Sequence, residues 1–135
     1  MAINTDKAAK PVGKYVHAKE AGDLVFLSGV GPRHPETDEI PVGIEDQTHA
    51  VFSNVKAILE AADLSMSNVV DIMVFLTNMK DDFSRFNQIY AEYLDGFEVT
   101  RTTIEVGSLP TPISVCLLYT SDAADEGLGV DLGGR

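Results

Sequence analysis

The sequence of 135 residues has no tryptophan, a single cysteine, and only 10 basic residues against 21 acidic ones. The one cysteine, Cys116, excludes an internal disulfide and a cysteine-rich zinc site. A net charge of -11 argues against a DNA- or RNA-binding surface, which needs clusters of lysine and arginine. No apolar run is long enough to span a bilayer. Residues 1–7 lack an apolar signal core, so we expect a cytoplasmic protein with no membrane partner.

The composition is otherwise that of one globular domain, with 44% hydrophobic residues. A chain of this size often forms oligomers, because a small domain buries a limited core of its own. Its three histidines, His17, His34 and His49, do not have the spacing of metal ligands, so we predict no metal site.

The pattern of apolar residues predicts the order β-β-α-β-α-β. Strands are expected over residues 15–19, 24–30, 69–77 and 102–106, and amphipathic helices over residues 47–62 and 83–94, the second capped by Asp81 and Asp82. Residues 1–12 are polar and are expected to be frayed. These elements favour an α+β two-layer sandwich with two helices on one face of a mixed sheet. The other face then needs a partner, for which a neighbouring subunit is the natural candidate.

The strand over residues 102–106 directly follows an arginine, Arg101. Burying a guanidinium away from water costs on the order of several kcal/mol of free energy unless the group is paired, as it does for any buried ion. The planar fork of arginine binds a carboxylate through two parallel hydrogen bonds. That carboxylate is either a side chain of the protein or a ligand, and the sequence pattern leaves both open.

Six spaced segments, taken together, resemble the RidA/YjgF/UK114 family of enamine/imine deaminases, and most of all its 2-aminomuconate deaminase branch. They are residues 10–18, 27–33, 74–79, 86–93, 101–103 and 109–113. The resemblance covers about residues 5–115. The interval between residues 93 and 101 is a few residues shorter than in the family.

The resemblance implies a chorismate-mutase-like fold, a homotrimer with clefts between subunits, and hydrolysis of a carboxylate-bearing enamine or imine to a keto acid and ammonia without a cofactor. It makes Arg101 the residue that holds the substrate carboxylate. It places five further residues along the cleft. They are Tyr15, Ser28, Asn87, Gly29 and Gly31, and the two glycines let the backbone approach the ligand because they have no side chain. We further hypothesise that Arg33 binds the distal carboxylate of a dicarboxylate substrate.

The chain departs from the family at Cys116, which stands where the family has a glutamate, fifteen positions after the arginine, thought to orient the attacking water. We therefore expect weak turnover in this chain. From Cys116 onward the sequence resembles a translated transposon sequencing adapter: residues 116–125 and 130–135 match it in one frame, and the interval is about what a sample index fills. We accordingly divide the chain into a domain of residues 1–115, with its final strand truncated, and a non-native disordered tail of residues 116–135. Residues 114–119, which span the boundary, are apolar enough to occupy a strand position by accident.

Three readings remain open besides the deaminase. The first is a non-catalytic ligand-binding or regulatory trimer, in which Arg101 holds small keto or amino acids without turnover. The second is a nucleic-acid role attached to this family, against which the acidic charge weighs. The third makes Cys116 a nucleophile, although no base is placed beside it by the sequence.

Overall fold

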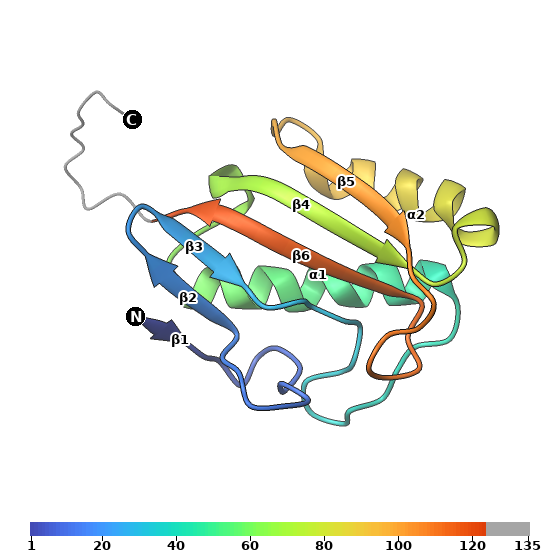
Figure 1. The fold of residues 1–135 in the computed structure, drawn as a ribbon, viewed down its shortest axis with the longest axis horizontal. Coiled ribbons are helices and arrows are strands. Elements are labelled where there is room, and N and C mark those ends of the chain that lie inside the picture. Colours follow the sequence, from blue (N-terminus) through green and yellow to red (C-terminus); the bar gives the residue numbers. More distant parts are fainter. Residues whose placement is uncertain (124–135) are drawn as a thin grey trace.

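The computed structural model describes residues 1–123 as one layer of helices packed on one sheet (Figure 1). The elements are β1 (Ala2–Ile3), β2 (Ala18–Ala21), β3 (Leu24–Leu27), α1 (Ile44–Ala61), the 3-10 helix η1 (Met66–Asn68), β4 (Val69–Leu76), α2 (Met79–Leu94), β5 (Thr100–Glu105) and β6 (Val115–Asp122).

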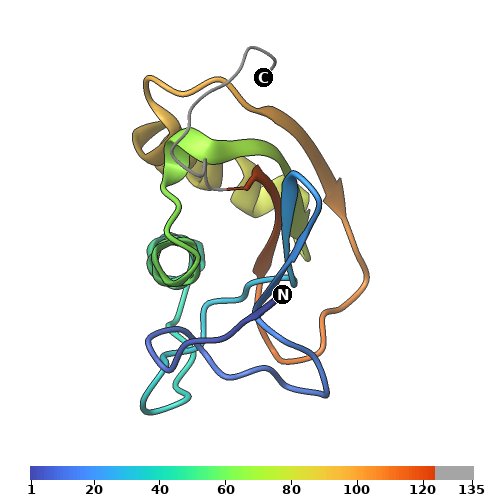
Figure 2. The same cartoon turned by 90° about the vertical axis from the view of Figure 1, so that its left-hand side faces the viewer.

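The six strands form one mixed sheet in the order β1-β2-β3-β6-β4-β5. β4 and β5 pair in parallel across the α2 crossover, and the other neighbours pair antiparallel. Figure 2 shows α1 end-on beside the sheet, with no helix on the opposite face of residues 1–123. The expected α+β sandwich, with two helices on a mixed sheet, is thereby confirmed. The chorismate-mutase-like description and the trimer remain predictions.

Helix α1 buries the face that the sequence predicts. Val51 and Val55 are fully buried, and Ile58 and Leu59 are almost so. The helix begins at Ile44, three residues earlier than expected, with Glu45 in its first turn, where acidic groups suit the helix dipole.

Helix α2 begins at Met79 rather than near Phe83, because a different residue caps it. The side chain of Asn78 accepts a hydrogen bond from the backbone N–H of Asp81 at 3.2 Å, so Asn78 is the cap in place of the expected Asp81 and Asp82. Within residues 1–123, neither helix is long and apolar enough to cross a membrane.

The N-terminal segment is ordered, contrary to the expectation of fraying. Ala2 and Ile3 pair with β2, and Ala8 is only 1% exposed, within the core. The backbone N–H of Ala9 donates to the side chain of Asn54 in α1. The sequence did not reveal this because the contacts join segments 45 residues apart.

Strand β6 also corrects an expectation, since residues 116–122 are not a disordered tail. The strand pairs with both β3 and β4 at the centre of the sheet. Alternate side chains enter the core: Val115, Leu117, Tyr119 and Ser121 are all 0% exposed. That period of two, together with backbone pairing on both edges, is enough to order the segment. The remainder of the expected tail, residues 124–135, lies outside the described part.

Two side chains of β6 fit the core poorly. The hydroxyl groups of Tyr119 and Ser121 are buried and have no hydrogen-bond partner within the described residues. Burial raises the pKa of Tyr119, so the phenol stays protonated with its O–H unsatisfied. A buried polar group left without a partner costs about 1–3 kcal/mol, so β6 is ordered at a local cost in stability.

We predict that Tyr119→Phe raises the free energy of unfolding by about 1 kcal/mol, because it removes an unsatisfied hydroxyl while keeping the ring. Urea denaturation followed by circular dichroism measures this. Tyr93→Phe is the matched control, since the Tyr93 hydroxyl bonds to Nδ1 of His49 at 2.7 Å and its loss should not stabilise. Equal effects of the two substitutions would contradict the assignment.

Candidate functional site

Six of the predicted site residues line one cavity of about 90 Å³. They are Tyr15, Ser28, Gly29, Gly31, Arg33 and Cys116. They come from three parts of the chain: the approach to β2, the segment that continues β3, and the start of β6. One further wall, residues 8–12, belongs to the N-terminal segment that the sequence was expected to leave frayed.

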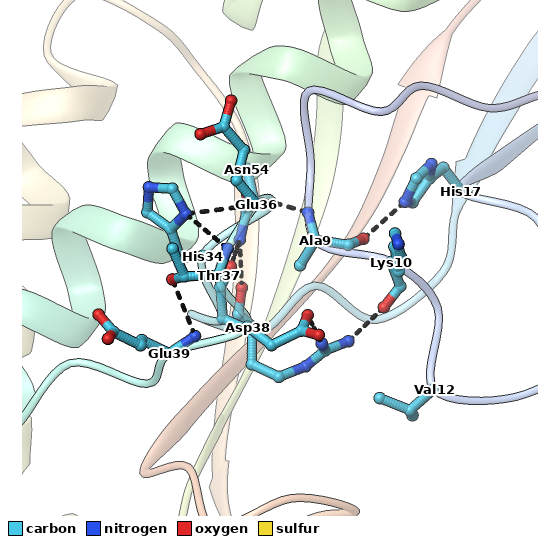
Figure 3. A network of polar contacts seen from close by, with 12 residues as sticks. Ala9, Lys10, Val12, His17, His34, Glu36, Thr37, Asp38, Glu39 and Asn54 are labelled. Atoms are coloured by element: carbon cyan, nitrogen blue, oxygen red, sulfur yellow. Dashed lines mark hydrogen bonds and ion pairs between the residues drawn. The ribbon is translucent and has the colours of Figure 1, made fainter.

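Asn54 of α1 fixes two walls of this cavity to each other. Its side-chain amide donates to the carbonyl oxygens of Gly31 and Arg33, both at 2.9 Å, and its Oδ1 accepts from the N–H of Ala9 at 3.2 Å. Asn54 is 2% exposed, so its amide makes these bonds away from water (Figure 3). A single buried amide thus sets the spacing of the walls.

His17 holds the same N-terminal wall from the other side. Its Nδ1 accepts from the N–H of Thr5 at 3.2 Å, which leaves the proton on Nε2, and Nε2 lies 2.7 Å from the carbonyl oxygen of Ala9. His17 is 7% exposed and also lines the cavity, but both of its ring nitrogens are bonded to the backbone, so it holds this wall in place.

The hydroxyl groups of Ser28 and Tyr15 are both bonded to the backbone. Ser28 donates to the carbonyl oxygen of Val16 at 2.7 Å and keeps its acceptor lone pairs. Tyr15 accepts from the N–H of Val12 at 3.1 Å and can still donate; it is 44% exposed. Each hydroxyl can therefore still form a hydrogen bond with a ligand, Ser28 as an acceptor and Tyr15 as a donor.

Arg33 is engaged by the protein itself. One terminal nitrogen pairs with the Asp38 carboxylate at 2.6 Å and the other donates to the carbonyl oxygen of Lys10 (Figure 3). The side chain is only 16% exposed. A distal substrate carboxylate would have to compete with Asp38, and the role of Arg33 in binding stays a prediction.

The two glycines of the cavity lining each lie against another lining side chain, Gly29 against Cys116 and Gly31 against Ile113. A Cβ added to Gly29 would lie 3.1 Å from the Sγ of Cys116, and one added to Gly31 would lie 3.0 Å from Ile113. The glycines thus make room for the protein's own side chains. Burial raises the pKa of Cys116 to about 11, so the thiol is neutral at pH 7 and is neither a nucleophile nor a base.

Arg101 and Asn87 lie apart from this cavity, together at the packing of β5 on α2. A terminal nitrogen of Arg101 donates to Oδ1 of Asn87 at 2.7 Å. The guanidinium stands 4.6 Å from the ring centre of Tyr90 and 5.7 Å from that of Phe83. These rings favour the cation and hold its plane in place.

The side chains of Arg101 and Cys116 point to opposite faces of the sheet. Arg101 contacts α2 and so points to the helix layer. Cys116 alternates with the fully buried Val115 and Leu117, and therefore points to the uncovered face. One protomer does not bring Arg101 and Cys116 together.

Arg101 differs from the other described arginines in having no carboxylate. Arg33 is paired with Asp38, and Arg85 with Glu45 at 2.7 Å. The partner of Arg101 is a neutral amide, which orients the guanidinium without neutralising it. Its remaining N–H donors and its full charge are therefore available to a ligand carboxylate.

Sequence reasoning missed further residues beside Arg101. Lys80, Ser84 and Thr103 line a shallow hollow there with Met79 and Phe83. Residues 80, 83, 84 and 87 are spaced to share one face of α2, a signal that could have located them. Within residues 1–123, no group of histidine, cysteine and acidic side chains is placed to hold a metal ion.

These features define the chain as a small α+β domain with an arginine, Arg101, that has a neutral amide partner and no carboxylate partner among the described residues. The family model described as Endoribonuclease L-PSP matches residues 5–116. The chain belongs to this family, which is the RidA/YjgF/UK114 family that the sequence resembles.

Relatives and solved structures agree with this membership. A RutC family protein of Pyrococcus horikoshii is 42% identical over 114 residues, 84% of this chain and 90% of the relative. The Escherichia coli protein named reactive intermediate deaminase TdcF is 35% identical over 116 residues, 84% of this chain and 89% of its own. The crystal structure of E. coli TdcF with bound serine has a TM-score of 0.87 and 32% identity, covering 92% of this chain and 98% of TdcF. RidA from an Antarctic Psychrobacter has a TM-score of 0.86 and 35% identity, covering 90% and 98%.

We predict that Asn54→Ala lowers the free energy of unfolding by about 3 kcal/mol. The substitution leaves the N–H of Ala9 and the carbonyl oxygens of Gly31 and Arg33 without a hydrogen-bond partner. Chemical denaturation measures the loss. Ser53→Ala, at the exposed neighbouring position of the same helix, should change stability by no more than about 0.5 kcal/mol. If the Asn54 variant were as stable as the Ser53 variant, the clamp would not hold the cavity walls.

Proposed function

We propose that the chain derives from a cofactor-independent deaminase that hydrolyses an enamine or imine beside a carboxylate, with 2-aminomuconate or a related 2-aminoacrylate-type compound as substrate. The observation that carries the proposal is Arg101, a partly buried arginine with a neutral partner and no carboxylate of its own. The deaminase name of the relative TdcF supports the reaction class.

The reaction needs little from the protein beyond positioning. An enamine first gains a proton on carbon and becomes the imine. Water then adds to the imine carbon, the C–N bond breaks, and the nitrogen leaves as ammonia, so that the carbon becomes the keto group. Arg101 would hold the adjacent carboxylate and fix the electrophilic carbon, while a group across the site orients the water.

We further propose that the site is completed between copies of the chain, in a homotrimer. Two observations support this. The side chains of Cys116 and Arg101 point to opposite faces of the sheet, so that a second copy is needed to bring one to the other. The uncovered face also carries partly exposed apolar side chains: Phe26, Met73, Phe75, Ile104 and Leu118. Burying such a face is what subunit association supplies.

Turnover in this chain is proposed to be weak because of Cys116. A neutral thiol with a pKa of about 11 neither attracts a proton from water nor places a negative charge beside it. A glutamate at this position would do both. Binding without turnover, the alternative of a regulatory trimer, is favoured by this same thiol and is separated from a deaminase by the next experiment.

We predict that Cys116→Glu raises kcat for ammonia release from a freshly generated enamine on the order of a hundredfold, with little change in KM. Cys116→Gln is the matched control, because it has the same shape but cannot accept a proton at neutral pH. Ammonia is measured by coupled glutamate dehydrogenase. Equal kcat for Gln and Glu variants would reject a role for the carboxylate, and no ammonia from either would favour a binding protein.

We also propose that residues from Cys116 onward stem from the adapter sequence. The family match ends at residue 116, which is the observation that supports this proposal. The strand that follows carries two of the four unpartnered buried hydroxyl groups of residues 1–123, those of Tyr119 and Ser121, while Tyr90 and Thr103 in the family-matched part carry the other two.

The expected result of re-reading the 3′ end of the gene from unfragmented source DNA is a glutamate codon directly after that of Val115, followed by a strand-forming sequence. A cysteine codon there, continued by residues 117–135, would reject the adapter origin. In that case the thiol would belong to the natural protein, and the ligand-binding trimer would become the better account.

A further inference from the structure

The hollow beside Arg101 has an unusual lining for so acidic a chain. Its six residues are Met79, Lys80, Phe83, Ser84, Arg101 and Thr103, which provide two cations, two hydroxyl groups and no carboxylate. The chain as a whole has a net charge of -11. A locally cationic lining attracts an anion that the rest of the surface repels.

The polar groups of this hollow are not used up by the fold. The two ion pairs of residues 1–123 involve neither Lys80 nor Arg101. The Oγ1 of Thr103 is buried and lacks a partner within the same residues. Lys80 and Ser84 are exposed and lie one helical turn apart on α2, so both can reach the same ligand.

The helix terminus itself is not the binding group. The N–H of Met79 donates to Oε1 of Glu105 at 2.8 Å, and that of Asp81 to the cap Asn78. Glu105 therefore closes the start of α2 with a carboxylate of its own. Any anion in the hollow is left to the side chains of Arg101, Lys80 and Ser84.

We propose that Lys80 and Ser84 form a second carboxylate subsite next to Arg101, so that the preferred ligand is a dicarboxylate. The inference rests on the proposed function, in which Arg101 holds the carboxylate beside the reacting carbon. Lys80 then takes the distal carboxylate and Ser84 donates a hydrogen bond to it. This assigns the second cation to Lys80 instead of Arg33, which Asp38 already neutralises.

The test is isothermal titration calorimetry of the full chain with 2-oxoadipate, a dicarboxylate keto acid, and with 2-oxobutyrate, which has one carboxylate. Lys80→Ala should weaken 2-oxoadipate binding about fivefold and leave 2-oxobutyrate binding unchanged. Lys19→Ala is the matched control, because it removes the same charge from an exposed position on β2. That strand lies toward the other end of the sheet from β5, which carries Arg101. Circular dichroism confirms that each variant is folded.

The possible outcomes distinguish a failure of the proposed subsite from a failure of the proposed function. If Arg101→Ala weakens both ligands but Lys80→Ala affects both equally or neither, the subsite is wrong and the carboxylate role of Arg101 stands. If the unmodified chain binds neither keto acid, the inference falls together with the proposed function. Loss of the 2-oxoadipate preference on Lys80→Ala alone supports the subsite.

Discussion

The sheet depends on the backbone pairing of one strand, β6. β1, β2 and β3 lie on one side of it and β4 and β5 on the other, and no other strand joins the two halves. Hydrogen bonds of this kind are made by the main chain, so they tolerate many side chains provided that alternate positions are apolar. Val115, Leu117 and Tyr119 satisfy that condition. A strand with alternating apolar side chains can therefore complete the sheet, even though the hydroxyl groups of Tyr119 and Ser121 are left without partners.

The cavity walls depend on a different kind of contact, made by buried side chains to the main chain. Asn54 and His17 bond the backbone of the N-terminal segment, and Asn54 also bonds the segment that follows β3. Such bonds are strong in effect because their breakage would leave buried groups without water. They fix the shape of the cavity before any ligand arrives, which is the condition for binding without a large ordering cost.

The sequence predicted what depends on local periodicity and missed what depends on remote contacts. The buried face of α1 was predictable from the spacing of Val51, Val55 and Leu59 alone. The order of the N-terminal segment was not, because it comes from Asn54, far along the chain. For the candidate site, by contrast, the individual residues could be selected by resemblance to the family. Their separation into two groups could not, since the face on which Arg101 emerges follows from the pairing of β5 with β4 and its packing on α2.

The partner of Arg101 explains why this arginine, and not another, suits a ligand. A carboxylate partner such as Asp38 at Arg33 fixes the side chain but cancels its charge. An unpartnered arginine would keep its charge but would have to be ordered when the ligand binds. Asn87 avoids both costs, because a neutral amide orients the guanidinium and leaves the charge intact. The ring of Tyr90 adds a second fixed contact without a negative charge, because a phenol is protonated at pH 7 and burial raises its pKa further. Orientation and charge are thus supplied by separate groups, an arrangement that supports the proposed role of Arg101 in binding a carboxylate.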